Sequence, residues 1–230
     1  MNINLGRVNI SKEDPAFLEV SSITSFLEKG GEYIPHCNNP EDAAIIVPYR
    51  DRQQHLYIFL HHIHPFIMKQ EIIHYKIYII HQTDSFEFNR ASLMNIGFVE
   101  ALKDFNWNCF IFHDVDHLPE DTRNLYSCTS DPILLAAAVD KWKYKMPYKT
   151  YFGGVVAMKK TQYEKINGAS NMFWGWGGED DDLRNRLVGN GLKPTVANNL
   201  FARYTTIHHT KEKMNPKRQK LLKEGKRRLK

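Results

Sequence analysis

The sequence predicts an α/β domain whose central β-sheet is mostly parallel and flanked by helices. Three largely apolar runs lie at residues 43–47, 75–80 and 109–112, and two stretches with helical spacing of apolar residues separate them. This succession of strand, helix, strand, helix and strand is typical of βαβ units. The composition, 42% hydrophobic and 25% charged over 230 residues, fits one enlarged globular domain and excludes a disordered, collagen-like or disulfide-dense chain.

The first half of the chain supplies the parallel part of this sheet. Residues 43–47 form a continuous apolar run, typical of a strand buried on both faces, and Pro48 predicts its end. Residues 52–64 repeat apolar side chains at helical spacing, and Pro65 predicts the end of that helix. A strand at residues 75–80, a helix at 89–104 and a strand at 109–112 complete this half. Ligands of such sheets bind beyond the carboxyl ends of the strands.

The second half is more mixed. Residues 132–139 and 151–158 predict strands, and Gly153 with Gly154 interrupts the latter, where missing side chains let a ligand or another backbone approach closely. A helix is expected to begin in the acidic residues 179–182, because negative charge favours a helix N-terminus, and glycines end it near residue 190.

The net charge of +5 is unevenly distributed. Residues 211–230 carry ten Lys or Arg against two Glu, a local charge of +8, so the preceding 210 residues carry −3. We expect an irregular lead-in at residues 1–40, a main domain at 41–218 and a basic tail at 219–230. A basic tail can bind nucleic acid or anionic lipid, whereas a solvated helical end is the simpler interpretation.

Neither a membrane span nor a secretory signal is visible in the sequence. No stretch approaches the ~20 apolar residues that a span needs, and the N-terminus lacks the apolar core of a signal peptide. This chain alone is therefore expected to be soluble. Its three cysteines, Cys37, Cys109 and Cys128, show neither a disulfide scaffold nor CxxC metal-site spacing.

Two acidic residues follow the third predicted strand. In an extended segment, Asp114 and Asp116 point the same way, so both can face one ligand. A divalent cation such as Mg²⁺ or Mn²⁺ is the simplest means of relieving their repulsion, and a solvated acidic turn is the alternative. A histidine of the pair at residues 208–209 could add a nitrogen ligand, which suits Mn²⁺ better; a surface pair is the alternative.

Residues 174–182 read Trp-Gly-Trp-Gly-Gly-Glu-Asp-Asp-Asp. Burying four carboxylates would cost more than two buried indoles could offset, which argues against a core strand. The glycines permit a bend and the indoles offer flat faces for a sugar ring, although a structural capping loop would also account for them. Arg50 and Arg52 follow the first predicted strand, and Arg90 stands at the start of the helix predicted at 89–104. Guanidinium groups there can bind diphosphate or fix a uridine-type ring, and surface ion pairs are the alternative.

Together these segments resemble the β-1,4-galactosyltransferase family, from about residue 33 to residue 218. The matching segments are residues 46–52, 88–91, 114–116, 151–155 and 174–182, of which the last is the most specific. The resemblance implies an inverting, metal-dependent enzyme of the GT-A nucleotide-sugar transferase fold, with a Rossmann-like sheet. It also implies UDP-galactose as donor, Mn²⁺ as cofactor, and terminal N-acetylglucosamine, glucose or xylose as acceptor. The glycosyltransferase catalytic domain would then be residues 41–218.

The resemblance also implies a role for each matching position. Asp180 is the catalytic base, and Asp116 and His209 are the metal ligands. Tyr151 stands where a tyrosine accompanies galactose transfer. Thr206 stands where the family often has a methionine ligand, and Gln219 where an aromatic residue is usual. The implied donor and nucleotide contacts are Arg50, Arg52, Phe88, Arg90, Asp114, Lys141, Trp176 and Glu179, and the acceptor contacts are Tyr148, Tyr151, Asp181 and Arg218.

The family places a disulfide at Cys109 and Cys128, and gives Cys37 a partner upstream of this chain, so a truncated or divergent N-terminus is expected. It also implies the Golgi lumen, an oxidising setting, with a membrane anchor that this chain lacks. We expect a glycan acceptor, no nucleic-acid partner, and a membrane association only through that anchor.

The interpretation adopted is galactose transfer to the 4-hydroxyl of a terminal N-acetylglucosamine. Residues 113–116 resemble the xylose-directed branch of the family, whereas Gly178 favours the N-acetylglucosamine branch. Two other classes stay open. Thr206 and Gln219 would fit a catalytically degenerate UDP-sugar-binding protein or lectin, and a nucleic-acid-binding tail would show steeply salt-dependent affinity.

Overall fold

The computed structural model describes residues 5–15, 17–23, 25, 27–28, 30–37, 40–210 and 212–228. Among these residues, seven strands form the main sheet in the order β1-β3-β2-β4-β8-β6-β9. The three strands predicted first are β2 (Glu41–Tyr49), β3 (Ile73–His81) and β4 (Cys109–His113), and β2 pairs in parallel with both of the others. The crossover helices are α2 (Gln53–Met68) and α3 (Arg90–Asp104). The predicted βαβ core is thus confirmed.

The sheet as a whole is mixed. On one side of the parallel core, β1 (Glu32–Tyr33) runs antiparallel to β3. On the other side, β8 (Val155–Lys159) runs antiparallel to β4 and to β6 (Ile133–Leu134), which pairs in parallel with β9 (Thr195–Val196). The α/β class is therefore confirmed, and the parallel arrangement is confined to the centre and to one short pair at the edge.

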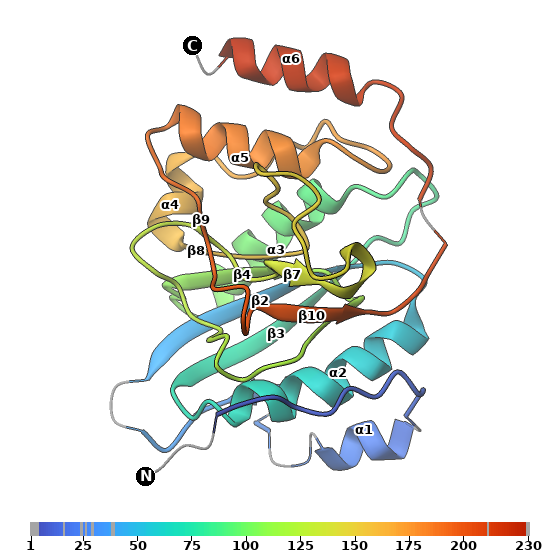
Figure 1. Cartoon of the computed structure of the whole chain (residues 1–230), viewed down its shortest axis with the longest axis vertical. Coiled ribbons are helices and arrows are strands. Elements are labelled where there is room, and N and C mark those ends of the chain that lie inside the picture. The colour runs from blue at the N-terminus through green and yellow to red at the C-terminus, as the bar shows by residue number, and fades with distance from the viewer. Residues whose placement is uncertain are drawn as a thin grey trace.

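Each face of the sheet has its own core, because neighbouring residues of β2 point to opposite faces. Ile45 and Val47 pack with Phe59 and Ile63 of α2, whereas the neighbouring residues of β2 pack with α3. Figure 1 shows α2 and α3 on opposite sides of β2 and β3. The helix on the second face lies close to the sheet because Gly97 has no side chain: a Cβ there would meet Ile46 Cγ2 at 2.3 Å.

A second, three-stranded sheet lies beyond the end of β4. It has the order β5-β10-β7, formed by β5 (His117–Pro119), β10 (Arg203–Thr206) and β7 (Ala138–Val139). The strand β10 is antiparallel to β5 and parallel to β7. A 3-10 turn, η1 (Asp140–Trp142), follows β7. This sheet holds the turn after β4 beside the segment that follows β10.

Four further helices complete the described chain. They are α1 (Phe17–Ile23), α4 (Lys160–Lys165), α5 (Glu179–Gly189) and α6 (Arg218–Arg228). In Figure 1, α6 lies along α5 at one end of the molecule and α1 lies beside α2 at the other. The α5–α6 contact is close, because a Cβ at Gly225 would lie 2.5 Å from Asp182 Oδ1.

Two prolines do not end their elements as predicted. The helix α2 continues past Pro65 to Met68, since the proline costs one N–H while Phe66 and Ile67 beyond it are buried. The strand β2 continues through Pro48 to Tyr49. Its pairing with β4 ends at Ile46, so beyond that point only β3 is paired with it and the missing N–H is tolerated.

Other predicted boundaries were also wrong in detail. Residues 132–139 form not one strand but β6 and β7, which belong to different sheets. The strand predicted at 151–158 begins only at Val155, because Gly154 has a φ of +74°. The lead-in at 1–40, expected to be irregular, contains α1 and β1. The basic tail contains most of α6, in agreement with its interpretation as a helical end. Residues 1–4 of that lead-in and 229–230 of that tail lie outside the described residues.

The disulfide implied by the family resemblance is confirmed. Cys109 at the start of β4 is bonded to Cys128, with their Cα atoms 5.5 Å apart. Cys37 is exposed and forms no disulfide with the described residues. None of the helices in the described ranges combines the length and the apolar character that spanning a bilayer requires.

Candidate active site

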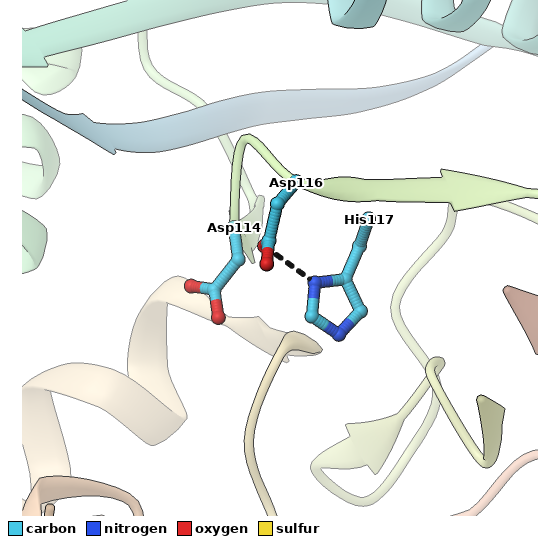
Figure 2. A group of neighbouring side chains, drawn as sticks. All are labelled: Asp114, Asp116 and His117. Carbon is cyan, nitrogen blue, oxygen red and sulfur yellow. Dashed lines mark hydrogen bonds and ion pairs between the residues drawn. The ribbon is translucent and has the colours of Figure 1, made fainter. Parts of the chain in front are cut away.

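The turn after β4 places both acidic residues of the Asp-Val-Asp motif. The Asp114 backbone N–H donates to the carbonyl of Gly154 (2.9 Å), and the N–H of Ile207 donates to the Asp116 carbonyl (2.9 Å). The turn is thereby attached to the loop before β8 and to the end of β10. Figure 2 shows both carboxylates turned toward one space, with the His117 ring beside Asp116. The Asp114 side chain is 29% exposed and that of Asp116 8%.

Two histidines contact the Asp116 carboxylate, one at each oxygen. His117 Nδ1 lies 2.8 Å from Oδ1, and His209 Nε2 lies 3.0 Å from Oδ2. Burial alone would raise the pKa of Asp116, but the charge and hydrogen bond of His117 and the hydrogen bond of His209 hold it well below its usual value. The bond to Asp116 raises the pKa of His209, although burial opposes that shift. Asp116 is thus an ionised carboxylate between two imidazoles.

Arg90 joins the Asp-Val-Asp turn to the acidic helix α5. It is the first residue of α3, and its side chain is 11% exposed. Its Nε donates to Asp114 Oδ1 at 2.6 Å and one terminal nitrogen donates to Asp180 Oδ1 at 2.9 Å. Its other terminal nitrogen and Oε2 of Glu179 are buried without a hydrogen-bond partner in the described chain. Both atoms are therefore suited to contact a ligand.

Asp180 lies in the first turn of α5, where the backbone amides favour negative charge. Burial raises the pKa of Asp180 well above its ordinary value; Arg90 opposes the shift, and the neighbouring carboxylates of Glu179, Asp114 and Asp181 add to it. Burial likewise raises the pKa of Glu179. Asp180 thus has the raised basicity that suits a group accepting a proton.

Glycines allow the close packing around this carboxylate. A Cβ at Gly153 would lie 2.1 Å from Asp180 Oδ2, so only glycine leaves room for the carboxyl there. Gly178 caps α5 in the left-handed conformation, with φ of +98°. A Cβ at that position would also meet the Phe173 ring at 2.9 Å.

The two tryptophans of the glycine-rich loop are exposed, Trp174 by 42% and Trp176 by 50%. The loop is attached to the segment before α6, because the backbone N–H of Trp176 donates to the Lys213 carbonyl (2.8 Å) and the backbone N–H of Asn215 donates to the Trp176 carbonyl (2.9 Å). An exposed indole on a glycine-flanked loop can cover a bound sugar.

A cleft of about 1020 Å³ opens beside His209. Arg50 and Arg52 line it, and Arg50 donates to the Phe86 carbonyl (2.5 Å), pairs with Glu212 (3.3 Å) and lies over the Phe88 ring at 5.4 Å. A guanidinium with an aromatic neighbour at the mouth of a cleft suits an anionic ligand that carries a flat ring.

The side of the site near α5 carries tyrosines. The Tyr148 hydroxyl donates to Asp181 Oδ1 at 3.0 Å, and its ring meets the Tyr151 ring edge to face at 5.6 Å. Arg218 lies at the glycine loop, because its Cδ is 3.3 Å from the Cβ position of Gly177.

The residues predicted from the sequence therefore gather in one region. The structure brings Asp114, Asp116 and His209 together at one end and Asp180 at the other, with Arg90 between them. Lys141, over the Trp142 ring at 4.6 Å, is near enough for its charge to lower the pKa of Asp116. His208, the neighbour of His209, has an exposed side chain.

Three residues at or beside the candidate site were not predicted from the sequence. His117 directly follows the acidic motif, and a histidine immediately after Asp116 was the available signal. Glu212 lies in the cleft with Arg50. Asp140 accepts hydrogen bonds from both the backbone N–H and the hydroxyl of Thr206, and its distance of 66 residues from that threonine left no local signal.

Two family models match the chain. One is described as the N-terminal region of glycosyl transferase group 7 and matches residues 1–129; the other is described as the N-terminal domain of galactosyltransferase and matches residues 134–210. The β-1,4-galactosyltransferase 4 of Cricetulus griseus is 48% identical over 197 residues, which cover 84% of this chain and 57% of that relative. The chain thus spans little more than half of this relative's length.

Solved structures agree with these matches. The catalytic domain of Drosophila β-1,4-galactosyltransferase 7, in complex with xylobiose, has a TM-score of 0.70 and 31% sequence identity, covering 80% of this chain and 79% of that one. A mutant of the same enzyme, in complex with manganese, UDP-Gal and xylobiose, has a TM-score of 0.68 and 31% identity, with 78% and 79% covered.

Proposed function

Since this chain belongs to the β-1,4-galactosyltransferase family and has its GT-A fold, we propose that it transfers galactose from UDP-galactose to the 4-hydroxyl of a terminal sugar. The proposed acceptor is N-acetylglucosamine on a glycoconjugate, and the anomeric configuration inverts. The complex of a solved relative with manganese, UDP-Gal and xylobiose supports the classes of cation, donor and acceptor.

One observation carries this proposal. Arg90 bridges Asp114 and Asp180 at 2.6 and 2.9 Å, so the acidic turn after β4 and the acidic start of α5 face one shared space. A donor held at the first segment and an acceptor held at the second would meet there. Two acidic segments on separate faces of the molecule could not serve one reaction.

The residues at the acidic turn fit a divalent cation. Asp114, Asp116 and His117 each offer one ligand atom, and these atoms lie within 4.8 Å of one another. Oxygen and imidazole donors together suit Mn²⁺. Asp116 and His209 would hold Mn²⁺, which when bound offsets the negative charge that develops on departing UDP.

Asp180 supplies the proton acceptor. As the acceptor 4-hydroxyl oxygen forms its bond to the anomeric carbon, its proton passes to the Asp180 carboxylate and the bond from that carbon to the diphosphate oxygen breaks. UDP leaves with the electron pair of the broken bond. Since the diphosphate needs no proton in order to leave, one carboxylate suffices, unlike the pair that glycoside hydrolases use.

The remaining side chains are assigned to the two substrates by position. We assign Arg50, Arg52, Phe88, Arg90, Asp114, Lys141, Trp176 and Glu179 to the donor. Tyr148, Tyr151, Asp181 and Arg218 are assigned to the acceptor side, with Tyr151 also favouring galactose. Trp176 would cover the bound donor and exclude water, which limits hydrolysis of UDP-galactose.

We also propose the Golgi lumen as the location and residues 41–218 as the catalytic domain. The disulfide between Cys109 and Cys128 supports an oxidising compartment. Residues 1–40 and 219–230 lie outside the assigned domain, although α6 packs on α5.

The test is an assay of the purified chain with UDP-galactose, Mn²⁺ and acceptors that end in N-acetylglucosamine, glucose or xylose. The expected result is a β-1,4-linked galactose, identified by NMR, with N-acetylglucosamine as the best acceptor. Asp180→Asn is the matched control, because it keeps the shape of the side chain and removes its basicity. A folded chain that binds UDP-galactose and transfers nothing to any acceptor would instead be a UDP-sugar-binding protein.

A further inference from the structure

His117 has an imidazole that the proposed reaction does not yet use. It is the first residue of β5, and its side chain is 2% exposed. Its Nδ1 lies 2.8 Å from Asp116 Oδ1, while its Nε2 is buried without a hydrogen-bond partner in the described part of the chain. A buried imidazole nitrogen without a partner is costly unless a ligand satisfies it.

The ring lies within coordination reach of the acidic turn. One ligand atom each from Asp114, Asp116 and His117 fall within 4.8 Å of one another, and Figure 2 shows the imidazole directed at the Asp116 carboxylate. Ligands bound at about 2.2 Å from one ion are at most about 4.4 Å apart. Small side-chain movements would therefore bring all three atoms onto a single cation.

Asp116 contacts both imidazoles, each through a different oxygen. His209 Nε2 contacts the second oxygen of the carboxylate at 3.0 Å and lies outside the group formed by Asp114, Asp116 and His117, so this ring has to move for one cation to bind both imidazoles. Neighbouring ligands of an octahedral ion are about 3 Å apart when each lies about 2.1 Å from it. The two imidazole contacts with Asp116, 2.8 and 3.0 Å, each have that spacing but are made to different oxygens, so the carboxylate has to turn for both rings to reach one ion.

Thr206, the residue opposite His117, is already hydrogen-bonded to another residue. The register of β5 and β10 pairs His117 with Thr206, so both side chains project from the same face of that ribbon. The Thr206 hydroxyl donates to Asp140 Oδ1 at 2.7 Å, and its backbone N–H donates to the same oxygen at 2.9 Å. In this pair it is His117 that has a buried side-chain nitrogen, Nε2, without a hydrogen-bond partner in the described chain.

Gly154 provides the room for the imidazole. A Cβ at Gly154 would lie 3.0 Å from His117 Nε2 and 3.3 Å from the Tyr151 hydroxyl. When Nδ1 binds a cation, Nε2 carries the proton and faces the same space as that hydroxyl, where it can donate to a substrate oxygen.

We propose that His117 is a direct ligand of the divalent cation, which this chain therefore holds through Asp116, His209 and His117. The inference rests on the proposed function for the presence of that cation. Two imidazoles beside one carboxylate favour ions that accept nitrogen, so Co²⁺ and Mn²⁺ are expected to bind more tightly than Mg²⁺.

The experiment counts nitrogen ligands of Mn²⁺ by electron spin-echo envelope modulation, with the full chain saturated with UDP. Couplings from two histidine nitrogens are expected in the wild type and from one in His117→Leu. The Mn²⁺ dissociation constant, measured by titration in the presence of UDP, should rise at least tenfold in the variant. His208→Leu is the matched control, since it removes the exposed imidazole beside His209, and it should leave both results unchanged.

The outcomes separate this inference from the proposed function. A wild-type chain that binds Mn²⁺ with only one histidine coupling would overturn the role of His117 and leave the proposed function intact. A chain that binds no divalent cation with UDP would overturn both. Should His117→Leu fail to fold, His117→Gln serves instead, because it keeps a side chain of similar reach and a hydrogen bond to Asp116 while removing the imidazole nitrogen that is counted.

Discussion

Gly153 and Asp180 are in contact: the space where a Cβ of residue 153 would lie is already taken by the Asp180 carboxylate, whose Oδ2 is 2.1 Å from that point. The loop before β8 and the start of α5 therefore fix the orientation of the proposed base together. No positive φ is required at Gly153, so a substitution there acts through steric contact and not through backbone strain.

Gly153→Ala should displace the Asp180 carboxylate and lower kcat by about 10²-fold, because a displacement of about 1 Å can cost that much in a positioned reaction. Binding of Mn²⁺ and UDP should change little. Gly6→Ala is the control, since a Cβ at Gly6 would meet nothing within 4 Å. Steady-state kinetics with both variants check this, and an unchanged kcat in Gly153→Ala would contradict it.

Asp180→Asn should lower kcat by about 10² to 10⁴-fold, the usual contribution of a positioned general base. The affinity for UDP-galactose should stay within a few fold, because the amide keeps the size of the side chain and Arg90 keeps its contact with Asp114. Calorimetric titration of UDP-galactose beside the kinetic assay separates the two effects. An equal loss of binding and turnover would assign Asp180 a structural role instead.

The pH dependence of kcat/KM should show the raised pKa of Asp180. A base must be ionised, so activity is expected to fall as the pH drops through a value clearly above 3.9, the ordinary pKa of an aspartate. The charged groups around it are Arg90, Glu179, Asp114 and Asp181. A pH–rate profile measured under saturating cation checks the position of the acidic limb, and a limb at or below pH 4 would contradict the raised pKa.

The same raised pKa predicts an effect on stability. The stability contributed by protonated Asp180 is fully present below its unfolded pKa of about 3.9 and is lost as the pH rises through its folded pKa. Asp180→Asn cannot ionise, so its Tm should exceed that of the wild type increasingly as the pH rises, by about 2 to 4 °C per kcal/mol. Thermal unfolding at a series of pH values checks the trend, and a constant Tm difference would refute it.

The disulfide between Cys109 and Cys128 closes a loop with a sequence separation of 19. Its loss should destabilise the protein by about 3 kcal/mol, chiefly because the unfolded chain gains conformational entropy. Cys128→Ser is therefore expected to lower the Tm by about 6 to 12 °C. Cys37→Ser is the control, because Cys37 is exposed. Thermal unfolding of both variants without reductant tests this, and equal effects on Tm would show that the bond contributes little.

The parallel core of the fold was predictable because β2 and β4 are buried on both faces, β3 is a largely apolar run, and the two crossover helices carry apolar residues at helical spacing. The spacing of apolar residues along the sequence indicates these properties. The short strands were not predictable: Ile133–Leu134 and Ala138–Val139 look like one apolar run, and only long-range pairing assigns them to two sheets. The helix through Pro65 shows burial of neighbouring residues outweighing a local preference.

Candidate site residues could be located in the sequence wherever they belong to compact motifs. Asp116 and Asp180 each stand in an unusual run of residues, and the roles proposed for them come from the family resemblance. The bond of Asp140 to Thr206 and the pairing of His117 with Thr206 depend on strand register, which no short motif records.

Asp116 and His209 are separated by 93 residues in the chain, yet Asp116 Oδ2 and His209 Nε2 are only 3.0 Å apart. An ion held by both would act as a reversible cross-link across a far longer loop than the disulfide closes, and by mass action it would stabilise only the folded chain. The amount of cation supplied by the compartment would then govern how long the folded protein lasts, apart from any effect on the proposed reaction.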